Sequence, residues 1–396
     1  MSATSSPTQT AAVTPGQFAL FRILFGAFLL QYFLRQLPDT ALARGTAFLM
    51  PAGMLAQVMG VLSLAFLLGL QRRLVAAVLG ALWAITLTQE EWGFASHALP
   101  CIGLLGLCAS VPNGEALSVS YRPTRAGRWS VPRWVFRAGW GMLAGGYLLI
   151  GLWKLAVLLG LLRDVTMMVP RVGALPGLPL LATAPDELVG VIFRAVMLAE
   201  ILFLPAASWP RIRPGAWVVM LAVEIAAAAT VKYSDLSLGM VMVHVFAFDS
   251  SWLPARSDAR RPVLLYDGEC GLCNGIVRLL LRDDAGGRLR FAPLQGAPAQ
   301  AYLRTRGLPT ADFDSLVFVP DWERPESGAP QLRTAGALGA LDEIGGVWRV
   351  VAGLRLLPAA LRDPVYKAIA RSRYALFGKY QPTPLPEPAW AQRFLP

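Results

Sequence analysis

The stretch Val263–Arg278, VLLYDGECGLCNGIVR, joins an apolar segment to a helical pattern through two cysteines. Its first four residues are apolar and favour a β-strand. Asp267 and Gly268 then favour a turn. From Cys270 onward, apolar residues recur at helical spacing. The sequence therefore predicts a strand, a turn and a helix, with both cysteines in the first helical turn.

Two cysteines in the first turn of a helix predict a thioredoxin-like redox site. Unpaired backbone N–H groups and the positive end of the helix dipole favour the thiolate, which is the reactive species. We expect Cys270 to be the attacking thiolate and Cys273 the resolving thiol one turn further on. Asp267 is expected to form the turn and to shuttle a proton. The alternatives are half of a zinc site and an inert pair, but no metal is expected, because the other cysteines and the histidines lie in apolar surroundings far up the chain.

This region resembles the DCC family of thiol-disulfide oxidoreductases, named for an Asp-x-x-Cys-x-x-Cys signature. The signature falls on Asp267, Cys270 and Cys273. The resemblance continues through Arg333-Thr334, Gly345 to Arg349, Leu361 to Asp363, and Arg373-Tyr374 to Gly378. It implies a thiol-disulfide oxidoreductase with no tightly bound cofactor, and with a protein or small-molecule thiol or disulfide as partner.

The composition predicts an integral membrane protein. The chain has 396 residues, 55% of them hydrophobic and only 15% charged, and its mean hydropathy is +0.50. The net charge of +11 does not indicate a nucleic-acid partner, because arginine in short loops between apolar spans is typical of membrane topology. We expect a bacterial inner (plasma) membrane protein in contact with the bilayer. The sequence gives no signal for its oligomeric state.

The predicted fold is an α-helical transmembrane bundle of about eight spans, followed by an α/β thioredoxin-like domain. Arginine gathers in the loops after the second, fourth and sixth spans and before the C-terminal domain, which places that domain in the cytoplasm. The predicted spans are 18–34, 53–70, 74–90, 98–112, 134–160, 188–206, 214–231 and 235–249. The predicted division is a disordered tail 1–15, a membrane domain 16–252, a basic linker 253–262, a thioredoxin-like domain 263–380 and a tail 381–396.

The C-terminal domain alternates strands and helices, as a central sheet flanked by helices requires. Asp314 and Ser315 stand where thioredoxins carry a cis-proline, so the contact with substrate must differ or be absent. The last two helices carry basic residues between apolar positions, which fits either anionic lipid or a solvated face. The predicted strands are 263–266, 288–293, 315–319 and 331–333, and the predicted helices are 273–282, 297–306, 335–344, 347–357 and 361–377.

The membrane half resembles HTTM domains, bacterial relatives of the membrane domain of the vitamin K-dependent gamma-carboxylase. The matching residues are Phe21-Arg22, the stretch Tyr147 to Leu155, and His244 with Phe248-Asp249. The resemblance implies that Lys154 is a base, although the lumenal portion of the carboxylase is absent here. An alternative function is therefore a carboxylase- or epoxidase-like enzyme acting on a quinone-like or lipidic molecule, with the thiols supplying reducing equivalents. A thiol-gated transporter or binding module is a third interpretation.

Ionisable residues within the apolar runs form a candidate membrane site. A charge at mid-bilayer costs about 2.5–3.5 kcal/mol, so such residues face a cavity and form pairs. We expect a carboxylate within ~4–6 Å of the Lys154 amine, lining a cavity, and favour Glu200 over Glu224. Structural ion pairs are the alternative, with Arg22 reaching the membrane interface and His244 packing as a hydrogen-bonded core residue. Cys101 and Cys108 lie ~10.5 Å apart along one helix and cannot form a disulfide.

Overall fold

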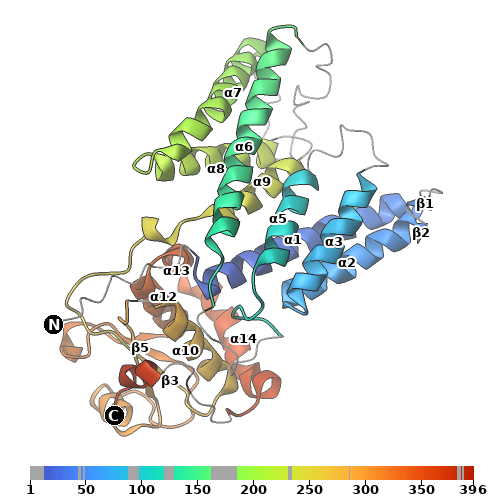
Figure 1. The fold of residues 1–396 in the computed structure, drawn as a ribbon. Coiled ribbons are helices and arrows are strands. Elements are labelled where there is room, and N and C mark those ends of the chain that lie inside the picture. Colours follow the sequence, from blue (N-terminus) through green and yellow to red (C-terminus); the bar gives the residue numbers. More distant parts are fainter. Residues whose placement is uncertain are drawn as a thin grey trace, which may run out of the picture. The chain divides into compact units, whose positions relative to one another are not determined.

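The computed structural model describes residues 13–42, 46–47, 50–87, 98–119, 129–161, 185–230, 234–284, 286–380, 385 and 388–396. The chain divides into two compact units (Figure 1). A helical unit comprises 18–121 and 131–248. The second unit comprises 1–17, 122–130 and 249–396.

The described part of the helical unit contains a helix at the position of each predicted span. Three helices, α1, α6 and α7, are long and apolar enough to cross a membrane, and α2, α5 and α9 are shorter apolar helices. An eight-span topology stays a prediction. The bounds are α1 (Pro15–Leu42), α2 (Ala52–Leu68), α3 (Arg72–Thr86), α5 (Ala98–Ser110), α6 (Arg133–Leu158), α7 (Asp186–Ser208), α8 (Arg213–Thr230) and α9 (Ser234–Ala247), with a short antiparallel pair β1 (Thr46–Ala47) and β2 (Met50–Pro51).

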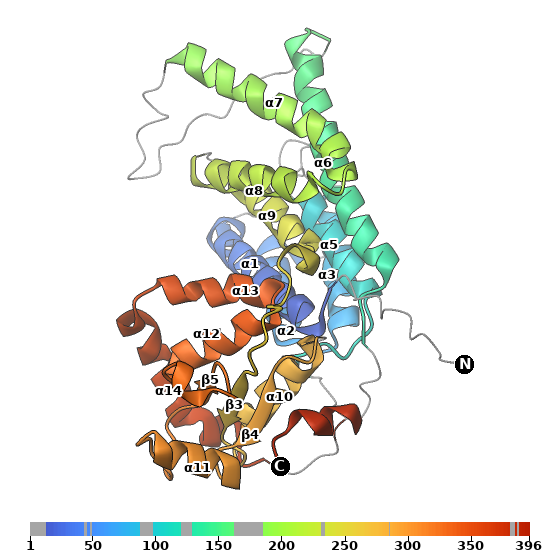
Figure 2. The same ribbon diagram turned by 90° about the vertical axis from the view of Figure 1, so that its left-hand side faces the viewer.

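Large apolar side chains lie on the outside of this unit as well as in its core. Leu149 on α6, Leu202 on α7 and Val218 on α8 are each exposed. In water such a surface would be unfavourable, whereas hydrocarbon solvates it. Helices α6 and α7 pack side by side, as do α8 and α9 (Figure 2).

The C-terminal unit is built on a mixed four-stranded sheet in the order β4-β3-β5-β6. Strand β3 pairs parallel with β4 and antiparallel with β5, and β5 pairs antiparallel with β6. The strands are β3 (Val263–Tyr266), β4 (Arg290–Pro293), β5 (Val317–Val319) and β6 (Gln331–Leu332). The helices are η2 (Ser250–Trp252), α10 (Gly271–Asp283), α11 (Ala297–Thr305), η3 (Pro325–Ser327), α12 (Arg333–Ile344), α13 (Val347–Ala352), η4 (Gly353–Leu356), α14 (Ala359–Phe377) and η5 (Pro388–Arg393).

The core of this unit explains the apolar run that precedes the cysteines. All four residues of β3 are buried, because β3 is a central strand with both faces covered. Val263 and Leu265 pack against Ala292, Leu303 and Val317 in one buried cluster. The sheet thereby fixes the end of β3, from which the cysteine-bearing turn emerges.

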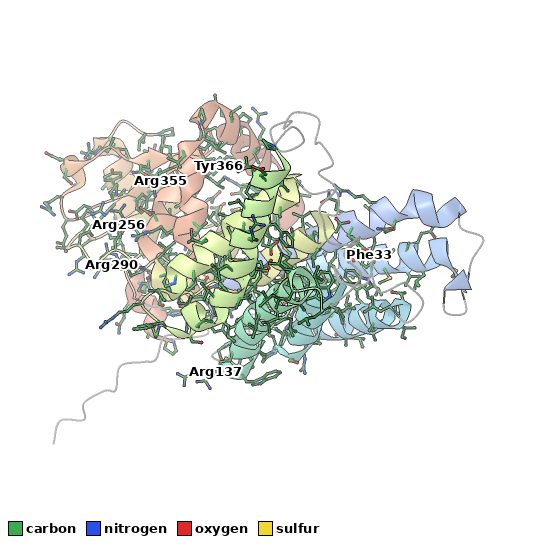
Figure 3. The ribbon with its side chains drawn as sticks, turned by 90° about the horizontal axis from the view of Figure 1, so that it is seen from above. Phe33, Arg137, Arg256, Arg290, Arg355 and Tyr366 are labelled. Carbon is green, nitrogen blue, oxygen red and sulfur yellow. The ribbon has the colours of Figure 1, made fainter. Side chains whose placement is uncertain are left out.

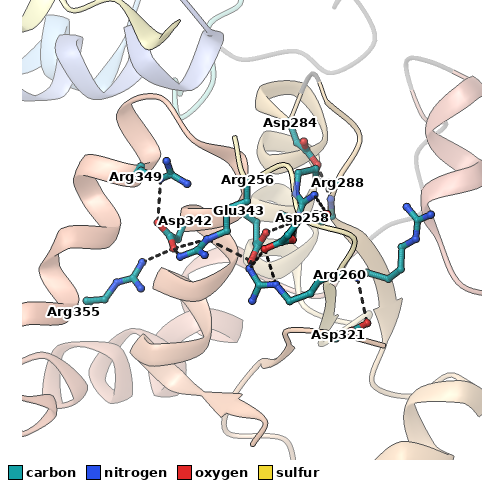
Figure 4. A network of polar contacts seen from close by, with 12 residues as sticks. Arg256, Asp258, Arg260, Asp284, Arg288, Asp321, Asp342, Glu343, Arg349 and Arg355 are labelled. Atoms are coloured by element: carbon teal, nitrogen blue, oxygen red, sulfur yellow. Dashed lines mark hydrogen bonds and ion pairs between the residues drawn. The ribbon is translucent and has the colours of Figure 1, made fainter. Parts of the chain in front are cut away.

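The segment predicted as a basic linker is held on the C-terminal unit by ion pairs (Figure 4). Arg256 pairs with Asp342 at 2.7 Å, and Arg260 pairs with Glu343 at 3.3 Å. Burial opposes ionisation of Asp342, but hydrogen bonds from Arg355 and Arg256 lower its pKa. Residues 254–262 therefore belong structurally to this unit.

Residues 13–17, most of which were expected in a disordered tail, also pack within the C-terminal unit. The Asp283 carboxylate accepts hydrogen bonds from the Thr14 hydroxyl at 2.7 Å, the Gly16 N–H at 3.1 Å and the Trp348 indole N–H at 2.6 Å. Burial raises the pKa of Asp283 to about 6, against the effect of these donors. The predicted tail residues before Val13 lie outside the described residues.

Candidate functional site

The two cysteines lie at the predicted strand–turn–helix junction. Cys270 is the N-cap residue of α10, and its Sγ accepts a hydrogen bond from the Cys273 N–H at 3.4 Å. The Asn274 side chain donates to the carbonyl oxygens of Gly268 and Cys270, both at 2.9 Å. These bonds hold the turn against the first turn of the helix, where the Cys270 sulfur receives a helix N–H group.

The Cys270 side chain is completely buried, whereas Cys273 is partly exposed. The segment Phe377–Tyr380, here called the closing strap, pairs with the turn around Cys270. The Gly271 N–H donates to the Gly378 carbonyl at 3.1 Å, and the Tyr380 N–H donates to the Glu269 carbonyl at 2.8 Å. In this conformation an external disulfide cannot reach Cys270.

The path of the closing strap is set by Gly378 and Tyr380. Gly378 follows the last turn of α14 with φ of 65°, a left-handed conformation that favours glycine. The Tyr380 hydroxyl accepts a hydrogen bond from the Arg278 guanidinium at 3.0 Å. The strap is therefore attached at its far end to α10, the helix that carries the cysteines.

The Asp267 carboxylate accepts hydrogen bonds from four groups. Oδ1 accepts from the Glu269 N–H at 3.1 Å and from the Gln295 amide at 2.9 Å. Oδ2 accepts from the Arg373 guanidinium at 2.8 Å and from the Tyr374 hydroxyl at 2.6 Å. The turn-forming role predicted for Asp267 fits this geometry. The role of Asp267 as a proton shuttle stays a prediction. Both oxygens of its carboxylate already accept hydrogen bonds from protein groups.

Arg373 connects the end of α14 to the cysteine site. The sequence places Arg373 within the stretch that resembles the DCC family but predicts no role for it at this site. Its guanidinium also donates to the Phe313 carbonyl at 2.7 Å, just before β5. Burial opposes its charge, but the neighbouring Cys273, Asp267 and Cys270 raise the pKa of Arg373. Among the described residues its Nε has no hydrogen-bond partner. A buried cation therefore lies beside both thiols.

The surroundings of Cys273 favour its neutral form. Burial, followed by the neighbouring Cys270 thiol, raises the pKa of Cys273 to about 12, although Arg373 opposes the shift. Cys273 is therefore a neutral thiol at neutral pH. A neutral second thiol fits a residue that reacts only after the first has formed a mixed disulfide.

Alkylation of Cys273 is expected to be slow at pH 8 and to rise about tenfold per pH unit up to about pH 11, because only the thiolate reacts. Cys270→Ser should accelerate the reaction at pH 8, since it removes a group that raises the pKa of Cys273. Peptide-level mass spectrometry after timed iodoacetamide labelling measures both rates. A rate for Cys273 that levels off near pH 9 would contradict this assignment.

Within the helical unit, the structure pairs Lys154 with Glu200, the carboxylate favoured from the sequence, while a cavity beside this pair stays a prediction. The Lys154 Nζ lies 2.6 Å from Glu200 Oε1, and both side chains are largely buried. Gly151 permits this approach, because a Cβ there would lie 2.8 Å from Ile201 and 3.1 Å from Glu200. A catalytic role for Lys154 stays a prediction.

The other candidate residues of the helical unit fall into two places. Glu224 lies beside Tyr147, whose hydroxyl is 2.8 Å from His244 Nε2. Arg22 lies elsewhere, fully buried beside Glu115 at 3.6 Å. Arg72 also pairs with Glu115, at 2.8 Å. Arg22 is therefore enclosed by protein groups, and the sequence interpretation missed its partner Glu115.

No group of three or more His, Cys, Asp or Glu side chains within the described ranges is placed to hold a metal ion. Cys101 and Cys108 are free and buried on α5. Among the described residues that could react by nucleophilic exchange, the pair Cys270 and Cys273 alone combines a helix N-terminus with a nearby buried cation.

Comparison with known proteins identifies the C-terminal domain. Residues 264–379 match the DCC1-like thiol-disulfide oxidoreductase family. The uncharacterized protein YuxK of Bacillus subtilis is 39% identical over 134 residues, which cover 34% of this chain and 93% of that protein. The chain belongs to the DCC family. A chloroplastic DCC family protein of Arabidopsis thaliana is 31% identical over 121 residues, which cover 30% of this chain and 67% of that protein. No solved structure matches the chain.

Proposed function

We propose that this DCC family member is a membrane-anchored thiol-disulfide oxidoreductase whose cytoplasmic Cys270 and Cys273 reduce a partner disulfide. The observation that carries the proposal is the Cys270 Sγ at the N-terminus of α10, next to the buried Arg373. The sheet order and the helix after β3 support a thioredoxin-like fold. The apolar helices α1, α6 and α7 support the membrane anchor.

The reaction is a two-electron exchange. Once the closing strap has moved away from Cys270, the Cys270 thiolate attacks one sulfur of the partner disulfide, and the other partner sulfur leaves as a thiolate and takes up a proton. The Cys273 thiol loses its proton and attacks Cys270 Sγ, which releases the second partner thiolate. The chain ends with a Cys270–Cys273 disulfide and the partner ends with two thiols. In the reducing cytoplasm the dithiol form dominates, so reduction of the partner is favoured.

A trapping experiment in intact cells tests this function. Cys273→Ser should accumulate mixed disulfides between Cys270 and cytoplasmic partners, because the resolving thiol is missing. The matched control Cys270→Ser/Cys273→Ser should trap nothing. Non-reducing electrophoresis followed by mass spectrometry identifies the adducts. Equal adduct levels in both variants would refute thiol exchange at Cys270, and partners from outside the cytoplasm would contradict the proposed topology.

A second candidate function places base chemistry at Lys154, acting on a quinone-like or lipidic molecule, with an HTTM-like domain as the membrane half. The buried ion pair between Lys154 and Glu200 favours it. The trapping experiment separates the two candidates through Lys154→Met in the Cys273→Ser background. The leading function expects unchanged adducts, whereas a joint reaction cycle expects Lys154→Met to change their level.

A further inference from the structure

The closing strap pairs with the chain around Cys270 as a neighbouring strand would. Cys270 has an extended backbone, and Lys379 of the strap forms an isolated antiparallel bridge with it. On either side of Cys270, the Gly271 N–H and the Glu269 carbonyl are hydrogen-bonded to the strap, at 3.1 and 2.8 Å. Both bonds use main-chain atoms of the strap, so they do not depend on its side chains.

The register of this bridge places Lys379 directly opposite Cys270. Because the flanking residues make the hydrogen bonds, the two form a non-hydrogen-bonded pair, in which opposite Cα atoms lie about 4.5 Å apart. Two cysteines can form a disulfide when their Cα atoms are about 4.4–6.8 Å apart. A partner cysteine at the position of Lys379 would therefore be placed to form a mixed disulfide with Cys270.

Gly271 makes room for a main chain beside Cys270. A Cβ at position 271 would lie 2.4 Å from the Phe377 carbonyl oxygen, so a side chain there would prevent this close approach. Gly271 is also the first residue of α10, and its N–H has no acceptor within the helix. The Gly378 carbonyl supplies that acceptor. The surface around Cys270 is thus shaped for an extended backbone.

Helix α14 is held in place independently of the closing strap. Tyr366 (Figure 3) accepts a hydrogen bond through its hydroxyl from the Leu316 N–H at 3.1 Å. Arg373 donates to the Phe313 carbonyl at 2.7 Å. Gly378 follows the helix with φ of 65°, so the strap can swing out there while α14 keeps these contacts.

We propose that the closing strap occupies the place of the partner, and that the partner is a polypeptide whose disulfide cysteine lies in an extended segment. This inference rests on the proposed function and names its substrate class. The segment replaces the strap, pairs antiparallel with residues 269–271 and places its cysteine opposite Cys270. The Cys270 thiolate then bonds to that sulfur, the partner disulfide breaks, and the other partner sulfur leaves with the electron pair and takes up a proton.

Main-chain pairing decides between a polypeptide and a small disulfide. Once the strap has left, the Gly271 N–H and the Glu269 carbonyl need new partners. An extended polypeptide supplies a carbonyl before its cysteine and an N–H after it, the same two groups that the strap uses. A small disulfide without peptide groups supplies neither. Each of these hydrogen bonds favours the polypeptide by about two- to tenfold.

Exchange kinetics of the full Cys273→Ser chain in detergent test the proposal. The substrate is a short threonine peptide whose central cysteine carries a thionitrobenzoate leaving group, and its absorbance gives the second-order rate constant at low peptide concentration. N-methylation of the residue after the cysteine removes the N–H that would bond to Glu269 and should slow release about two- to tenfold. N-methylation of the cysteine itself is the matched control, because that N–H points away from residues 269–271 in this pairing. The Cys270→Ser/Cys273→Ser chain gives the background rate.

Gly271→Ala gives a second readout, in which the two kinds of substrate separate. The added Cβ displaces the strap, so mercaptoethanol carrying the same leaving group should react faster. The same Cβ would meet the main chain of a polypeptide, so the peptide should gain several-fold less. Gly275→Ala, where nothing lies within 4 Å of a Cβ, should leave both rates unchanged.

Equal rates for the two N-methylated peptides would overturn the proposal, and that comparison needs no change at Gly271. An equal gain for the peptide and the small disulfide in Gly271→Ala would also overturn it. Either result would leave exchange at Cys270 intact, with the strap as a simple cover. Reaction of neither disulfide above the background rate, with or without Gly271→Ala, would instead refute thiol exchange at Cys270 and this proposal with it.

Discussion

Gly271→Ala is expected to expose the Cys270 thiol and to raise its alkylation rate at pH 8 about tenfold or more. A Cβ at position 271 would lie 2.4 Å from the Phe377 carbonyl oxygen and 3.2 Å from that of Gly378. Both are backbone atoms of the closing strap, so the strap itself must move. An overpacked contact costs about 1–3 kcal/mol, which shifts the balance toward an open strap by one or two orders of magnitude.

Gly275→Ala is the matched control, because nothing lies within 4 Å of a Cβ at that position on the same helix. Alanine there should stabilise α10 by roughly 0.5–1 kcal/mol and leave Cys270 protected. Labelling with N-ethylmaleimide in a Cys273→Ser background, read by peptide mass spectrometry, isolates Cys270. Equal Cys270 labelling in both variants would show that the closing strap does not limit access.

The strand, turn and helix around the cysteines could be predicted because each depends on neighbouring residues. The apolar run of β3, the Asp267-Gly268 turn and the helical spacing after Cys270 are local signals. The ion pair of Lys154 with Glu200 was also predictable, since a buried ammonium needs a carboxylate and the apolar spans offer few. These predictions used only the chemistry of the residues themselves.

The contacts that control the cysteine site were not predictable in this way. Arg373 meets Asp267 across 106 residues of sequence, and the closing strap reaches Cys270 from a similar distance along the chain. Such pairings depend on how α14 packs, which periodicity does not specify. Glu115 was missed because it follows α5, outside the apolar run, although it pairs with the buried Arg72.

Arg373→Met is expected to destabilise the C-terminal domain by about 3–5 kcal/mol, the cost of leaving one partner of a buried ion pair alone. The Asp267 and Arg373 side chains are only 5% and 8% exposed, and their charges are 2.8 Å apart. Methionine has a similar length and fills much of the same space. The lost charge therefore dominates over the change in packing.

Asp267→Asn added to Arg373→Met should restore a large part of this loss, because the double variant leaves no unpaired charge at the site. Hydrogen exchange of the β3 amides in the full chain measures the effect. A loss of 3–5 kcal/mol lowers their protection by about two to three and a half orders of magnitude if they exchange through opening of the domain.

The single variant Arg373→Met should also slow Cys273 alkylation at pH 8, since Arg373 lowers the pKa of the Cys273 thiol. A merely structural role would change the protection of β3 without slowing Cys273. Additive losses in the double variant would show that Asp267 and Arg373 act independently.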